Sequence, residues 1–144
     1  MHIGKKIQMG LVTMALGLFA HAASPEVVVI VSSKNPATTL RIEQVADLFL
    51  GQSGNFPEGA EAVPIDQAVG SAIRDEFYAK VTGKSPPLMK AYWSKMIFTG
   101  RRQPPKEVPD SVAMKKLVAE SPHLIGYIDK SAVDASVKAL LTVR

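Results

Sequence analysis

The sequence predicts an α/β fold in which a sheet is flanked by helices. Three observations indicate it: β-branched runs typical of buried strands, apolar residues at helical spacing between those runs, and turns rich in glycine and proline that separate them. Strands and helices alternate along the chain, as α/β layering requires. The length of 144 residues corresponds to one domain. A composition that is 47% hydrophobic and 21% charged excludes a disordered chain.

The first two predicted elements are a strand and a helix. The run Glu26–Val31 consists mainly of valine and isoleucine, which is typical of a strand buried on both faces. A polar loop containing Pro36 follows it. A helix is expected at about Arg41–Leu50, and Gly51 can end it. The apolar residues that recur there at helical spacing are Ile42, Val45, Leu48 and Phe49.

A second strand and helix follow a turn-rich stretch at 52–60. The strand, Glu61–Asp66, is less regular because Pro64 cannot donate to a sheet ladder. The helix spans about Ser71–Val81. It should face the sheet with a stripe formed by Ile73, Phe77 and Val81.

The second half of the chain predicts two helices and two strands. A third helix begins after Ser85, which suits an N-cap, and has prolines in its first turn. Its Tyr92 and Trp93 could line a sugar or aromatic site, but such residues more often belong to a core or a protein contact. Gly100–Asp110 is expected to be a loop. The remaining elements are a short helix at 111–120, a strand at 122–128 and a final strand at 137–143.

The N-terminus has the pattern of a secretory signal peptide. Lys5 and Lys6 precede an uncharged, largely apolar run at 7–20, and Ala20-His21-Ala22 offers the small side chains that a signal peptidase needs. An uncleaved membrane anchor is the alternative. The apolar run is shorter than the roughly 20 residues of a membrane span, which favours the signal peptide.

Cleavage after Ala22 would remove residues 1–22 and leave a domain of residues 23–144. The loss of two lysines lowers the formal charge from +4 to +2, so part of the basicity belongs to the targeting segment. We expect a periplasmic or secreted protein with no stable membrane anchor after cleavage. Export also argues against nucleic acid as a partner.

Composition excludes several kinds of chemistry. The chain has no cysteine, so disulfides, thiolate zinc sites and cysteine nucleophiles are excluded. Of its three histidines, His2 and His21 lie in the signal segment, and His123 has no Ser–Asp partnership visible in the sequence. A metal-binding loop needs carboxylates at a regular spacing, and this spacing is absent from the acidic residues Asp66, Asp75 and Glu76. We therefore expect no enzyme activity, no catalytic residue, no metal and no cofactor.

Gly70, Ser71 and Arg74 form a candidate ligand-binding site. They begin a helix directly after a strand, where free backbone N–H groups and the helix dipole suit a small oxyanion. Ser71 could donate its hydroxyl and Arg74 a bidentate guanidinium. The alternative is that Ser71 is only an N-cap and Arg74 is solvated. Ser32 and Ser33 are also candidates, because they end the first strand and ligands of open α/β sheets bind at such ends; an ordinary polar connection is the alternative.

Arg101, Arg102 and Lys106 form a basic patch in the proline-rich loop. The patch could be an electrostatic landing site for an anion or an acidic partner. The alternative is that these side chains are simply solvated.

Three stretches resemble the periplasmic phosphate-binding proteins, the solute receptors of phosphate ABC importers. Residues 42–51, IEQVADLFLG, are similar to the family's helix end L-x-x-I-F-x-G. Residues 70–77, GSAIRDEF, are similar to its G-S-G-T-R-x-x-F element, and residues 121–127, SPHLIGY, to its x-P-G-A-I-G-Y strand. The resemblance covers most of 26–143. It implies one lobe of a type II periplasmic binding protein-like fold, with a mixed sheet flanked by helices.

In that family the serine, threonine and arginine of the second element sit around the phosphate, which implies binding roles for Ser71 and Arg74. Ala72 and Ile73 depart from the family pattern, because they replace its second glycine and its threonine. The family's upstream arginine and aspartate correspond to positions near Gln67 and Val69. The 122 residues after cleavage leave no room for a receptor's second lobe.

The resemblance implies an exported, non-enzymatic solute-binding-type domain. It would bind phosphate, sulfate or another small oxyanion as a transport or sensory accessory. The alternative is a protein-interaction module of the cell envelope that has lost ligand binding and has an envelope protein as its partner.

Overall fold

The computed structural model describes residues 4, 10, 17 and 24–144. The predicted signal segment, residues 1–22, lies outside the described residues except for those three glycines, and its cleavage stays a prediction. Within the described part, no helix combines the length and the apolar composition needed to cross a membrane.

A five-stranded mixed sheet forms the centre of the fold, with the strand order β3-β2-β4-β1-β5. The strand β1 pairs antiparallel with both β4 and β5, whereas β2 pairs parallel with both β3 and β4. This architecture confirms the predicted α/β class and the mixed sheet. The strands are β1 (Val27–Ser32), β2 (Val63–Gln67), β3 (Lys106–Val108), β4 (Leu124–Asp129) and β5 (Val137–Val143).

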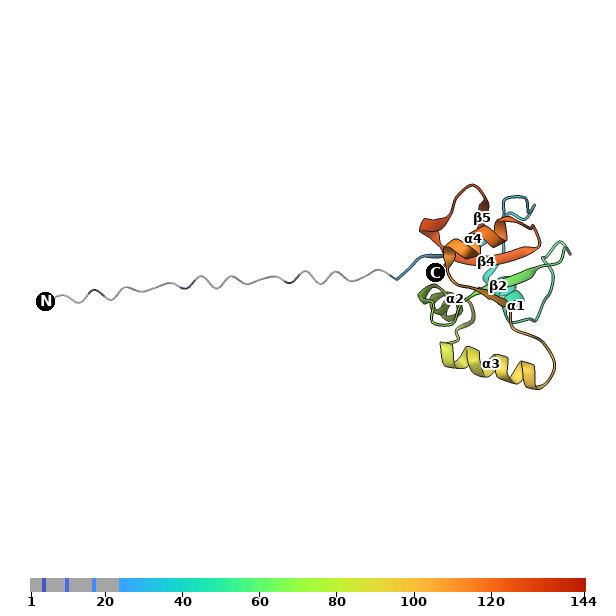
Figure 1. Cartoon of the computed structure of the whole chain (residues 1–144), viewed down its shortest axis with the longest axis horizontal. Coiled ribbons are helices and arrows are strands. Elements are labelled where there is room, and N and C mark those ends of the chain that lie inside the picture. Colours follow the sequence, from blue (N-terminus) through green and yellow to red (C-terminus); the bar gives the residue numbers. More distant parts are fainter. Residues whose placement is uncertain (1–3, 5–9, 11–16, 18–23) are drawn as a thin grey trace.

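Helices cover both faces of the sheet (Figure 1). They are α1 (Ile42–Phe49), α2 (Ala72–Thr82), α3 (Pro86–Phe98) and α4 (Ser111–Ala119). Alternate residues of β1 point to opposite faces, so Val27, Val29 and Val31 pack with α1 and α2, while Val28 and Ile30 pack with α4. Every residue of β1 is therefore buried, as its continuous apolar run predicts.

The helix α3 lies farthest from the sheet (Figure 1). It is tied to the end of α1 by the Tyr92 hydroxyl, which donates to the carbonyl oxygen of Leu50 at 2.6 Å. Met89 and Trp93 reach from α3 into the core on the α1 and α2 side. The core alternative for Tyr92 and Trp93 is thus confirmed, with Trp93 buried and Tyr92 partly buried.

One predicted loop contains a strand. Gly100–Asp110 was expected to be irregular throughout, but Lys106–Val108 forms β3 and pairs with Ile65–Gln67. Its three residues lie among prolines and do not alternate between apolar and polar side chains. Their strand conformation therefore depends on pairing with β2 and not on their own strand propensity. Because β3 begins opposite Ile65, Pro64 lies outside the β2–β3 pairing, although it lies opposite Ile125 in the β2–β4 pairing.

The predicted stripe of α2 faces the sheet. Phe77 is fully buried, and Ile73 and Val81 are partly buried against the same core. The Phe77 ring stacks on Tyr127 of β4, with ring centroids 3.9 Å apart, and meets the Phe49 ring edge-on at 4.8 Å. Such aromatic contacts add to the free energy of burial.

Replacing Phe77 with alanine should lower the free energy of unfolding by about 3–5 kcal/mol, because the change empties a buried aromatic site. Phe98→Ala is a matched control, since Phe98 is 91% exposed and its loss should cost within about 0.5 kcal/mol. Urea unfolding of both variants measures the difference. Equal losses would mean that the structure assigns the wrong face of α2 to the core.

Candidate functional site

The candidate site lies where β2 leads into α2. After Gln67 the chain turns through Gly70, whose φ of +94° is a conformation that glycine adopts readily. Ser71 then caps the helix: its hydroxyl oxygen accepts from the backbone N–H of Arg74 at 3.2 Å. The same hydroxyl donates to the side-chain oxygen of Gln67 at 2.8 Å. The N-cap role expected for Ser71 is confirmed, and both hydrogen bonds are made within the protein.

The Arg74 guanidinium contacts oxygen atoms of the protein itself. Its Nη1 donates to the backbone oxygen of Gln67 at 2.8 Å and to Oε1 of Glu107 at 2.8 Å. The same nitrogen lies 3.5 Å from Oδ2 of Asp66, and the guanidinium lies over the Tyr78 ring at 5.5 Å. Since the side chain is only 13% exposed, Arg74 is not a freely solvated cation.

Beneath Arg74 lies a buried carboxylate, Asp66. The Tyr78 hydroxyl donates to its Oδ2 at 2.6 Å, the Tyr127 hydroxyl donates to its Oδ1, and the Gln67 backbone N–H donates to Oδ1 at 3.0 Å. Burial raises the pKa of the Asp66 carboxyl above its ordinary value, although the tyrosine hydrogen bonds and the charge of Arg74 oppose the shift. Burial also raises the pKa of the Tyr78 and Tyr127 hydroxyls, and the nearby Asp66 charge adds to the effect.

Sequence reasoning considered Asp66 only as a possible metal ligand and missed this role. An available signal was its place in a predicted strand directly after Ile65, which is buried in the structure. The two tyrosines that bind it come from α2 and β4, so only the tertiary structure brings them together. Within the described part of the chain, no cluster of three or more metal-ligating side chains is present.

The structure does not bring Ser32 and Ser33 together with the Ser71 and Arg74 site. Because β1 is antiparallel to β4 and β2 is parallel to it, the end of β1 lies near the start of β2. Gly70 and Ser71 follow the opposite end of β2. Ser32 is buried and donates to the backbone oxygen of Ala119 at 3.2 Å, while Ser33 is exposed. The five predicted residues therefore lie at two separate ends of the sheet.

The Arg74 site opens into a hollow of about 680 Å³ between α2 and α3. Arg74 and Glu107 lie on its wall together with Tyr78, Met89 and Trp93. A hollow with this lining can accommodate a solute larger than a single ion, and most of its wall is apolar.

Lowering the pH should stabilise the wild-type protein relative to an Asp66→Asn variant. A carboxyl whose pKa is raised by folding contributes stability below its unfolded pKa, and the contribution is lost as the pH rises through the folded pKa. The window therefore runs from the raised pKa of the folded state down to the ordinary value of 3.8. Each unit of pKa difference is worth about 1.4 kcal/mol.

Urea unfolding of both proteins at a series of pH values tests this, since the other titrating groups cancel in the difference between them. A difference that stays constant with pH would show that folding does not shift the pKa of Asp66.

Comparison with known proteins gives a consistent picture of the fold. No protein-family model matches the sequence, and no curated protein matches it. A solved structure described as a phosphate ABC transporter substrate-binding protein of Clostridium perfringens, with bound phosphate, is 29% identical, with a TM-score of 0.63 over 81% of this chain and 44% of that one. An ABC-type phosphate transport receptor from Vibrio cholerae is 23% identical, with a TM-score of 0.64 over 81% and 45%.

PstS from Borrelia burgdorferi is 18% identical, with a TM-score of 0.59 over 81% of this chain and 46% of that one. The chain thus spans less than half the length of the solved structures that it matches. Its mixed sheet and flanking helices are those of one part of these receptors. The resemblance first seen in three sequence motifs is confirmed by the fold: the chain is a relative of the periplasmic phosphate-binding proteins.

Proposed function

We propose that the chain is an exported, non-enzymatic solute-binding-type domain that binds phosphate or another small oxyanion at Ser71 and Arg74. Its role would be that of an accessory in transport or sensing. The similar solved structures are substrate-binding proteins, and one of them contains bound phosphate, which supports a binding role over a catalytic one.

The observation that carries this proposal is the carboxylate of Glu107 on the Arg74 guanidinium, at 2.8 Å. A carboxylate is itself a small oxyanion, so its position marks a place where Arg74 favours such a group. The Glu107 side chain is 46% exposed, and an exposed ion pair contributes little to stability. A free oxyanion can therefore replace the Glu107 carboxylate at low cost.

Two features of the site set the strength of binding. In the first turn of α2, backbone N–H groups have no hydrogen-bond partner within the helix and can face an anion. The helix dipole also favours negative charge there. In opposition, Asp66 keeps a negative charge 3.5 Å from Nη1 of Arg74. Binding should be weak, and a dissociation constant near 1 mM corresponds to only about 4 kcal/mol.

Glu107→Gln should strengthen phosphate binding severalfold, because it removes the internal carboxylate that competes for Arg74. Arg74→Gln should weaken binding by about tenfold or more, since it removes a charge-assisted contact. Titration with phosphate and with sulfate, followed by amide chemical shifts at residues 69–74, measures both. Glu58→Gln is the control, because it removes an exposed carboxylate from the turn before β2.

If phosphate shifts no amide at residues 69–74 in either the wild type or Glu107→Gln, the oxyanion proposal fails. The second candidate, a protein-interaction module with an envelope protein as its partner, would then be favoured. Its supporting observation is that three large apolar side chains of α3, Leu88, Ile97 and Phe98, are exposed.

Export is part of the proposal. We expect cleavage after Ala22 and a mature domain of residues 23–144 in the periplasm or the medium. Intact-mass measurement of protein recovered from the periplasm tests it. A mass that still includes residues 1–22 would favour the anchored alternative and restore the formal charge of +4.

A further inference from the structure

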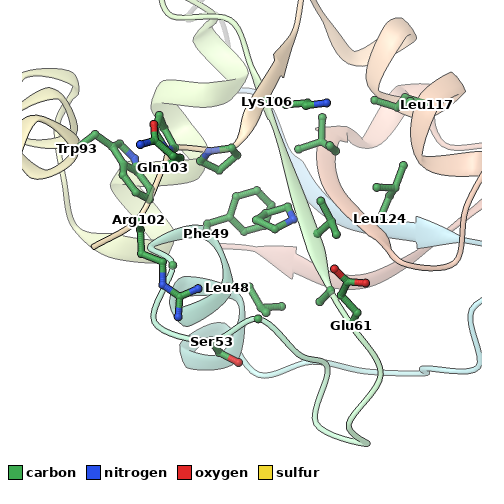
Figure 2. A pocket seen from close by; sticks show the side chains of 18 residues that line it. Leu48, Phe49, Ser53, Glu61, Trp93, Arg102, Gln103, Lys106, Leu117 and Leu124 are labelled. Atoms are coloured by element: carbon green, nitrogen blue, oxygen red, sulfur yellow. The ribbon is translucent and has the colours of Figure 1, made fainter. Parts of the chain in front are cut away.

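A second hollow, of about 540 Å³, lies at the start of β2, away from the Arg74 site. Its walls are the end of α1 with the following turn, the edge of β2, and residues 102–106, here called the 102–106 segment. Figure 2 shows Trp93 and Arg102 on one side, Leu117 and Leu124 on the other, and Phe49 between them. The volume falls within the range of small-molecule sites.

The floor of this hollow is apolar. Leu48 and Phe49 of α1 and Ile65 of β2 are buried side chains that line it, and Leu117 and Leu124 are half-buried. Such a floor offers favourable contacts to an apolar group and offers nothing to a fully hydrated inorganic ion.

Two cations, Arg102 and Lys106, stand at the rim of the hollow. Both are exposed, and within residues 24–144 neither forms an ion pair with an acidic side chain. The Arg102 stem runs over the turn after α1, so closely that a Cβ added to Gly51 would lie 3.3 Å from its Cγ. Glu61 is the one acidic residue on the wall, so the lining has a positive balance.

Trp93 supplies a further polar atom. Its side chain lines the hollow and is only 6% exposed. Its indole Nε1 is the one buried side-chain polar atom of the described residues that has no hydrogen-bond partner. Because an unpaired buried donor is unfavourable, an acceptor that reached this N–H from either of the hollows that Trp93 lines would be stabilised.

We propose that this hollow binds a small organic anion: a molecule with an aromatic or aliphatic body and a carboxylate, sulfonate or phosphate-ester end. The body packs on the apolar floor, and the anionic end lies at the rim, near Arg102 or Lys106. This site is distinct from the proposed oxyanion site, because the two hollows lie at opposite ends of β2, although both have Trp93 and Pro104 in their walls.

The test uses 8-anilinonaphthalene-1-sulfonate and N-phenyl-1-naphthylamine, which have the same aromatic body with and without the sulfonate. Binding is followed by dye emission and by quenching of Trp93, the only tryptophan of the sequence. The sulfonate should bind the wild type at least tenfold more tightly than the neutral dye. Amide shifts should gather at residues 48–54, 61–65 and 102–106.

The double variant Arg102→Gln/Lys106→Gln should lose at least tenfold in affinity for the sulfonate and should bind the two dyes equally. The matched control is Lys95→Gln/Arg101→Gln, which removes the same charge from exposed residues outside both hollows and should stay within twofold of the wild type.

Three results would overturn the proposal: no dye binding, equal losses in the two double variants, or shifts confined to residues 69–78 and 84–90. Complete and strictly competitive displacement of the dye by inorganic phosphate, at the concentration that shifts residues 69–74, would likewise show that the two sites are one.

Discussion

The buried carboxylate of Asp66 connects the elements on which the rest of the structure depends. It lies on β2, and its hydrogen-bond donors come from β4 through Tyr127 and from α2 through Tyr78. A buried charge is tolerated only where donors surround it, so β2, β4 and α2 must be correctly placed at the same time. The Phe77 ring, stacked on Tyr127, joins this polar cluster to the aromatic core of the same face.

The same carboxylate explains how the site departs from an open anion receptor. Arg74 is a cation at the start of α2, but its Nη1 already contacts Asp66, Glu107 and the Gln67 carbonyl. The positive charge of Arg74 is therefore partly neutralised by groups of the protein itself. Of the two carboxylates only Glu107 is accessible, so it is the contact that a solute can replace.

The sequence predicted most of the fold because its signals are local. The valine run of β1, the Phe77 stripe of α2 and the Ser71 cap depend on side-chain period and on a single turn. The strand β3 was missed because three residues gain their conformation only by pairing with β2. The separation of Ser32 from Ser71 and the tyrosine pair around Asp66 both depend on strand direction, which no local pattern encodes.

Trp93 lines both hollows, so one side chain forms part of the wall of each. A solute that fixes the ring from one side changes the shape offered to a solute on the other side. Thermodynamic linkage makes this influence mutual and equal in both directions. If both proposed sites are occupied, a single side chain of the domain therefore lies between the two occupants.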